Sequence, residues 1–156
     1  MFKKIAAIAF VAAFAPVAFA GAESGDAEIA VSGDIISGDG FTSSTIFGAY
    51  GYYFTDAIKV DFILGLSSVE AGGFTQDTTI YGINGEYNFG GEDMVPFVFA
   101  GFVSFDSDGF SDTGYSVGVG ARFYMSENAG FKIDASMNTV GDADYTASKF
   151  GLFYNF

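Results

Sequence analysis

The chain has 156 residues, with 19 Asp and Glu against 6 Lys and Arg, which gives a formal net charge of −13. It contains no His and no Cys, which excludes Ser-His-Asp and Cys-His nucleophiles, His or Cys metal and haem ligands, and disulfides. The few basic residues also argue against a nucleic-acid partner, because neutralising phosphates needs clustered Lys and Arg. With 20 Phe, 9 Tyr and 50% hydrophobic residues, the chain has ample apolar surface to bury, so it is not expected to be disordered.

Residues 1–20 have the three parts of an export signal. Two lysines lie within the first four residues, an apolar run covers 5–15, and Ala18 and Ala20 form the small-x-small pattern that a signal peptidase reads. We therefore expect a cleaved signal peptide and a single mature domain over 21–156. A retained membrane-anchoring helix is the less favoured alternative, because the run is short and no positive charges follow it.

Alternation with a period of two predicts strands along the rest of the chain. In the clearest segment, Phe131 and Ile133 are apolar while Lys132 and Asp134 between them are charged. The predicted strands cover 28–37, 45–54, 58–67, 78–89, 96–105, 115–124, 131–138 and 145–156. In the segment 96–105 both faces are apolar, so the sequence does not show which face points inward.

The connectors between these segments differ in length and predict an up-and-down meander. Short connectors at 55–57, 90–95 and 126–128 alternate with longer, mostly acidic ones at 38–44, 68–77, 106–112 and 141–144. A transmembrane strand needs about 9–11 residues, so a chain of this length accommodates eight strands but not the sixteen of a wide porin. The predicted fold is an all-β, eight-stranded, antiparallel, up-and-down transmembrane β-barrel, whose narrow lumen is normally filled by side chains.

A soluble barrel with an apolar interior is the competing interpretation. Residue size argues against it, because small residues such as Gly65, Ser116, Gly118 and Gly120 lie on the polar alternation, where a crowded interior needs them. Charged residues lie on this alternation too. The predicted lumen charge network consists of Glu28, Asp34, Lys59, Asp61, Glu86, Arg122, Lys132, Asp134 and Lys149. Mixed signs allow these charges to pair, and a paired plug is favoured over a proton or ion path.

Aromatic rings gather near the short connectors and predict an interfacial girdle, in preference to a plain hydrophobic core. The girdle residues are Tyr50, Tyr52, Phe54, Tyr87, Phe89, Phe123, Tyr154 and Phe156.

The last predicted strand contains Lys149, Gly151, Tyr154 and Phe156, and this pattern resembles the assembly signal of Gram-negative outer-membrane β-barrels. The chain is similar to the small outer-membrane β-barrel domain family, which includes the outer membrane protein A barrel. The resemblance implies insertion by the barrel-assembly machinery, short turns in the periplasm and long loops outside. The peptidoglycan-binding domain of longer members is missing, and so is the His that lipid-deacylating members place beside a Ser.

The remaining motifs carry weaker predictions. The acidic segment 106–112 has oxygen ligands for calcium but lacks EF-hand spacing, so a solvated loop is favoured. The glycines at Gly118 and Gly120 lie within a strand, which favours lumen packing over a nucleotide loop. Phe41, Phe74 and Phe110 lie beside glycines in three long loops, where they either anchor a partner or fold over the barrel mouth.

These observations predict an integral protein of the cell outer membrane with a structural or surface-interaction role. No catalytic, cofactor-binding or metal-binding residue is predicted. The expected partners are outer-membrane lipid, the barrel-assembly machinery and an extracellular partner bound through the acidic loops. A narrow passive pore for ions or small solutes is the second interpretation, and a loop-borne enzyme acting on lipid is the third.

Overall fold

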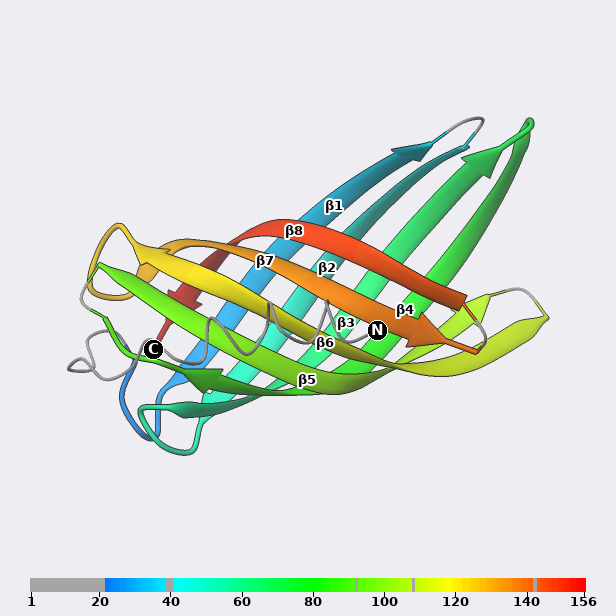
Figure 1. The fold of residues 1–156 in the computed structure, drawn as a ribbon. Coiled ribbons are helices and arrows are strands. Elements are labelled where there is room, and N and C mark those ends of the chain that lie inside the picture. The colour runs from blue at the N-terminus through cyan, green and yellow to red at the C-terminus, as the bar shows by residue number, and fades with distance from the viewer. Residues whose placement is uncertain (1–21, 39–40, 92, 108, 142) are drawn as a thin grey trace, which may run out of the picture.

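The computed structural model describes residues 22–38, 41–91, 93–107, 109–141 and 143–156. This part of the chain forms eight antiparallel strands, each paired with the next, and β1 also pairs with β8, so the sheet closes into a barrel. The strands are β1 (Ala27–Gly38), β2 (Phe41–Tyr53), β3 (Ile58–Ala71), β4 (Phe74–Asn88), β5 (Met94–Ser107), β6 (Phe110–Tyr124), β7 (Ala129–Val140) and β8 (Ala143–Asn155). Figure 1 shows the strands of the two walls crossing, the tilt that closure of a barrel requires. No helix among the described residues is long and apolar enough to cross a bilayer. The predicted fold is confirmed.

The two ends of the barrel differ in how the strands are joined. At the end where β1 begins and β8 finishes, termed the terminal end, the connectors cover 54–57, 89–93 and 125–128. At the opposite end, termed the hairpin end, consecutive strands are separated by only two positions, as at Gly72 and Gly73. These two glycines have φ of 56° and 84°, the left-handed backbone that a two-residue hairpin turn requires.

The expectation of longer connectors at the hairpin end is therefore wrong. The strands continue through most of the segments 38–44, 68–77, 106–112 and 141–144. Polar residues occupy both faces of these extensions, so the apolar-polar alternation that identifies a half-buried strand disappears while the backbone ladder continues.

Outward-facing side chains form an apolar belt around the barrel. On β3, for example, Phe62, Leu64 and Leu66 all lie on the outer face and are 59%, 58% and 65% exposed. On every strand from β2 to β8, the apolar residue of the belt nearest the hairpin end has a Ser or Thr two positions away, on the same face and closer to the hairpin end. These pairs are Ile46/Ser44, Leu66/Ser68, Tyr81/Thr79, Phe102/Ser104, Tyr115/Thr113, Met137/Thr139 and Phe150/Ser148. The hydroxyl residues form a Ser/Thr collar that marks the edge of the belt.

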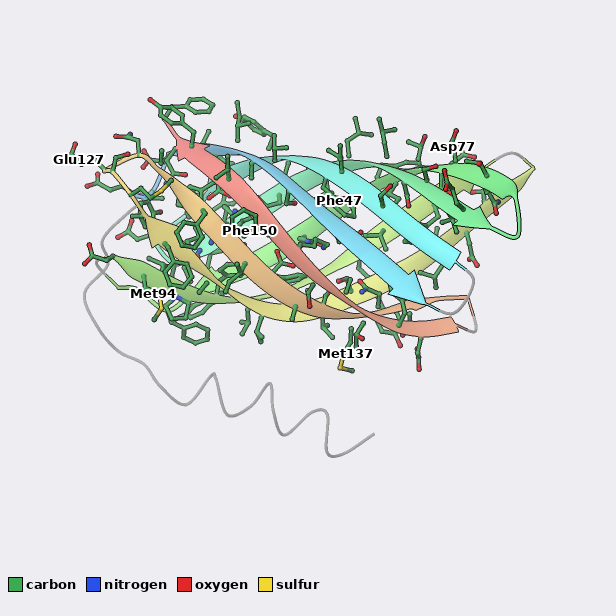
Figure 2. All side chains as sticks on the ribbon, turned by 90° about the horizontal axis from the view of Figure 1, so that it is seen from above. Phe47, Asp77, Met94, Glu127, Met137 and Phe150 are labelled. Carbon is green, nitrogen blue, oxygen red and sulfur yellow. The ribbon has the colours of Figure 1, made fainter. Side chains whose placement is uncertain are left out.

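Aromatic pairs mark the opposite edge of the belt, at the terminal end. The ring centres of Tyr52 and Phe54 are 5.1 Å apart, and those of Tyr154 and Phe156 are 6.4 Å apart. Figure 2 shows the length of the barrel between these edges, with Glu127 at the terminal end and Asp77 at the hairpin end. Amphipathic rings at one boundary are typical of a membrane interface.

Pairing between β1 and β8 ends where the belt ends. It runs from Glu28 opposite Asn155 to Gly33 opposite Phe150, and Phe150 is the last apolar residue of β8 before the collar. An unpaired strand edge in hydrocarbon leaves backbone groups unsatisfied at several kcal/mol each. The ladder is thus complete beside the apolar belt residues of β8 and opens at Lys149, one position before Ser148 of the collar.

The structure assigns the inward face of β5, which the sequence left open. Phe97 and Phe99 point into the lumen and are 1% and 8% exposed, while Phe102 points outward and is 72% exposed. Their register partners on β6 are Gly120 and Gly118. A Cβ atom added to either glycine would meet the tip of the facing ring, so the two glycines make the space that the rings fill.

Candidate functional site

The inner face of the barrel carries two groups of charged side chains at different depths. The deeper group, termed the plug, lies within the terminal half of the belt. It consists of Glu28, Lys59, Asp61, Glu86, Arg122 and Lys132. The exposed fractions of these residues range from 0% to 8%, so the charges are almost completely removed from water.

Arg122 on β6 is the centre of the plug. Its Nε donates to Glu28 Oε2 at 2.8 Å, and its Nη2 donates to Glu28 Oε1 at 3.2 Å and to Glu86 Oε2 at 2.9 Å. Nη1 donates to Asn88 Oδ1 at 2.8 Å and lies 2.6 Å from Glu86 Oε1. A guanidinium has five N–H groups, and four hydrogen bonds and one close ion pair surround that of Arg122.

The carboxylate of Glu28 on β1 accepts hydrogen bonds at both of its oxygens. Besides Arg122, its carboxylate accepts a hydrogen bond from Lys59 Nζ at 2.6 Å and from the Tyr53 hydroxyl at 3.2 Å. Lys59 Nζ also lies 2.9 Å from Asp61 Oδ1 and 3.6 Å from Glu86 Oε2. Such pairing is what makes buried charge tolerable in a low-dielectric interior.

Aromatic rings close the plug from the sides. The guanidinium carbon of Arg122 lies 4.6 Å from the centre of the Phe97 ring and 5.9 Å from that of Phe153. Lys132 is buried in the same layer, opposite Arg122 in the register, but it forms none of the ion pairs within 4.0 Å found among the described residues. Charge, hydrogen bonds and rings together fill this half of the lumen.

The second group lies closer to the hairpin end, at the bottom of a cavity of ≈ 1830 Å³. We term this cavity the cup. Its lining includes Asp34 on β1, Asp134 on β7 and Lys149 on β8. Lys149 Nζ lies 3.8 Å from Asp134 Oδ1, beyond hydrogen-bond distance, and 4.9 Å from the centre of the Phe47 ring. The nine charges predicted as one network are therefore divided between a tightly paired plug and a loosely paired cup.

The residues of the predicted assembly signal lie on both faces of β8. Lys149 and Gly151 face the lumen, where Gly151 lies opposite Ser32 of β1. Tyr154 and Phe156 face outward and are 54% and 56% exposed. Only the two rings are thus available on the outer surface.

Several predicted features fall outside what the structure describes. Ala18 and Ala20 of the predicted cleavage site lie outside the described residues, and so do the side chains of Phe41, Phe74 and Phe110. In the acidic segment 106–112, position 108 is also outside this range. Among the described residues, no group of three or more Asp or Glu side chains is arranged to hold a metal ion.

Some residues of the site are not evident from the sequence pattern. Tyr53 and Asn88 complete the plug through hydrogen bonds, and Phe97 and Phe153 form its walls. Tyr53 could have been found, because it alternates with the outward rings at positions 52 and 54. The walls could not be found from one strand alone, since a large ring facing a glycine is visible only once the register is known.

A closed barrel with an apolar belt, aromatic rings at one edge and a charged, buried interior is an integral membrane β-barrel. The family model of the outer membrane protein beta-barrel domain matches residues 5–156, and the chain belongs to this family. The family places the protein in the outer membrane.

Solved structures show the same fold. The N-terminal β-barrel domain of Pseudomonas aeruginosa OprF is 21% identical, with a TM-score of 0.66 over 86% of this chain and 100% of that domain. Neisserial surface protein A is 16% identical, with a TM-score of 0.58 over 84% of this chain and 96% of its own. Pseudomonas aeruginosa OprG is 14% identical, with a TM-score of 0.56 over 89% and 99%. Comparison with curated proteins gives no match.

Proposed function

We propose that this protein is a non-conducting, non-enzymatic outer-membrane barrel with a structural or surface-interaction role. The observation that carries the proposal is the plug, in which Arg122 and Lys59 are 0% exposed. Both cations are paired with carboxylates inside the barrel, so they offer neither a hydrated path to an ion nor a reactive group to a substrate. The lumen of a small barrel is ordinarily filled in this way.

Planar-bilayer recording tests the absence of conduction. Purified protein is inserted into phosphatidylcholine membranes in concentrated KCl, and a wide porin inserted afterwards into the same membrane verifies sensitivity. We expect a flat current trace before the porin is added. Stable, reproducible current steps from this protein alone would contradict the proposal and support the narrow pore instead.

The proposal places the hairpin end outside the cell and the terminal end in the periplasm. The hairpins at the hairpin end extend beyond the Ser/Thr collar and present polar faces to water, which suits contact with an extracellular partner. Exposed carboxylates occur at both ends, for example Asp77 and Asp144 at one and Asp56 and Glu127 at the other. Acidity therefore does not distinguish the ends, and the orientation rests on the length of the hairpins. Proteolysis of intact cells carrying a cleavable sequence between Gly72 and Gly73 tests it, and protection from external protease would reverse the assignment.

We also propose that residues 1–20 are cleaved during export and that the barrel-assembly machinery recognises the outward rings of the assembly signal, Tyr154 and Phe156. Phe156→Ala and Phe150→Ala provide a matched pair, because the two rings are 56% and 58% exposed. Burial of either ring in lipid contributes a similar ~1.5–3 kcal/mol, so a thermodynamic effect alone predicts equal losses. Recognition predicts that only Phe156→Ala lowers the amount of folded protein in the outer membrane. Equal amounts of the two variants would remove support for the signal.

Sequencing the amino terminus of the mature protein checks cleavage after Ala20.

A further inference from the structure

The cup is bordered by a row of polar side chains that follows the strand register from β1 to β5, and by a polar pair on β7 and β8. Neighbours in the row are register partners on adjacent strands, as Asp34 is to Thr45 and Thr45 is to Ser67. The Thr45 hydroxyl donates to Ser67 Oγ at 3.0 Å. The row of Asp34, Thr45, Ser67, Thr78 and Ser107 and the register pair of Asp134 and Lys149 are together termed the polar band. The band does not cross β6, where the register partners of Ser107 and Asp134 are Phe110 and Gly120. Asp34 and Lys149 face each other one position beyond the last registered pair of β1 and β8.

The charges of the lumen do not balance at every depth. In the plug, three carboxylates accompany three cationic groups. The charged members of the polar band are two carboxylates, Asp34 and Asp134, and one ammonium group, Lys149. Asp77 and Asp106 border the cavity, but they share the outward alternation of Thr79 and Ser104 and add no charge to the lumen. The surplus negative charge inside the barrel is thus concentrated in the cup.

Each carboxylate of the cup has one oxygen that accepts no hydrogen bond from the described residues. The Asp134 side chain is only 7% exposed, yet its Oδ1 accepts no hydrogen bond from the described residues. Asp34 Oδ1 also accepts no hydrogen bond from the described residues. The ammonium group of Lys149 lies between the Phe47 and Phe99 rings, 4.9 and 5.9 Å from their centres, and stays 3.8 Å from Asp134. A buried charged acceptor without a donor costs free energy, so this arrangement is complete only when a further donor occupies the cup.

We propose that the cup binds a protonated organic amine. An ammonium group donates three hydrogen bonds and carries the charge that the surplus carboxylates attract, and the hydroxyls of Thr45, Ser67 and Thr78 supply neutral acceptors around it. A divalent metal fits less well, because the described residues contain no cluster of three or more acidic groups. The cavity of ≈ 1830 Å³ exceeds the ~300–1,000 Å³ of a typical small-molecule pocket, so an extended polyamine fits within it. A free amine and the amine headgroup of a lipid share this chemistry.

Spermidine is the probe that tests the proposal. The intact protein is placed in phosphatidylcholine nanodiscs, which contain no primary amine, and amide shifts are followed by NMR during titration. We expect saturable shifts at Asp34, Thr45, Ser67 and Asp134, with none at the terminal end. The neutral diol 1,4-butanediol should cause no shifts. Nanodiscs containing phosphatidylethanolamine identify the lipid headgroup as the source if the cup amides are already shifted before spermidine is added.

Two variants with a matched control separate a built site from general attraction to an acidic protein. Asp34→Asn and Asp134→Asn should each weaken spermidine binding roughly tenfold or more, because each removes a charge-assisted hydrogen bond. Glu127→Gln removes the same charge from the exposed connector at the terminal end and should leave binding unchanged. Equal weakening by all three variants overturns the proposal, and so do shifts confined to residues outside the cup. If Asp134→Asn does not fold, Asp34→Asn and the titration of the unsubstituted protein still decide the question. Absence of saturable shifts in that titration means that water alone fills the cup.

Discussion

The plug and the cup are lined by side chains from the same strands, but they differ in how fully their charges are paired. In the plug, Glu28 accepts four hydrogen bonds from Arg122, Lys59 and Tyr53. The plug oxygens Asp61 Oδ1 and Glu86 Oε1 accept no hydrogen bond from the described part of the chain, but they lie 2.9 and 2.6 Å from a cationic nitrogen. In the cup, Asp134 Oδ1 accepts none from these residues either, and the nitrogen of Lys149 is 3.8 Å away. The difference follows the filling of the lumen, since side chains close the plug and the cup opens toward the hairpin end.

This comparison indicates that access to water decides what a buried charge requires. In the plug, where side chains exclude water, Glu28 and Arg122 need protein partners. In the cup, water or a ligand can complete a carboxylate. Four substitutions test this account.

Arg122→Met should lower the free energy of unfolding by about 3–5 kcal/mol, because it leaves Glu28 and Glu86 buried without their main partner. Urea unfolding in phosphatidylcholine bilayers, followed by the mobility shift of the folded barrel on gels, measures this loss. A loss below ~1 kcal/mol, the range of a solvated surface pair, would show that water reaches the plug.

Val119→Arg should cost about 2–4 kcal/mol, because it places a charge on the outer face of β6 within the belt. Thr113→Arg provides the control on the same strand and the same face, but at the collar, and should cost at most about 1 kcal/mol near the interface. The same unfolding assay compares the two. Similar losses would mean that the collar does not mark the edge of the hydrocarbon.

Gly120→Ala should cost about 1–3 kcal/mol, because the added methyl group meets the Phe97 ring that closes the plug. Gly48→Ala on β2 provides the control, since its nearest neighbour would be Leu64 O at 4.0 Å. Thermal unfolding in detergent should separate the variants. Equal stability of both would show that the lumen at Gly120 has room to spare.

Lys149→Met should cost at most about 1 kcal/mol, because its only ion pair among the described residues is 3.8 Å long and the cup is open to solvent. Methionine keeps the apolar stem that packs against Phe47. The urea assay used for Arg122→Met gives the direct comparison. A loss as large as that of Arg122→Met would erase the distinction between the two regions.

Much of the fold could be predicted, because alternation survives wherever one face meets lipid and the other meets the lumen. The inward position of Lys59, Asp61 and Arg122 follows from that pattern alone. The pattern fails on β5, where Phe97 is buried inside and Phe102 faces outward, so both faces are apolar. It also fails beyond the collar, where polar residues occupy both faces.

The pairing of the site could not be predicted, because it joins residues far apart in the sequence. Arg122 and Glu28 are 94 positions apart, and their contact depends on the stagger of the whole barrel. The division into plug and cup has the same origin. It depends on the depth of each charge relative to the belt, which no single strand reveals.

The turn at Gly72 and Gly73 has a consequence for how this surface can change over time. A side-chain atom added at either position would have nothing within 4 Å, and both residues lie beyond the belt on the β3–β4 hairpin. Lengthening such a turn raises the cost of loop closure by only about 0.6 kcal/mol for each doubling of its length. New segments can therefore enter the chain at this tip while the strands, the rings and the plug keep their structure. The hairpin end is free to diversify, and the membrane-embedded part of the barrel can stay constant beneath it.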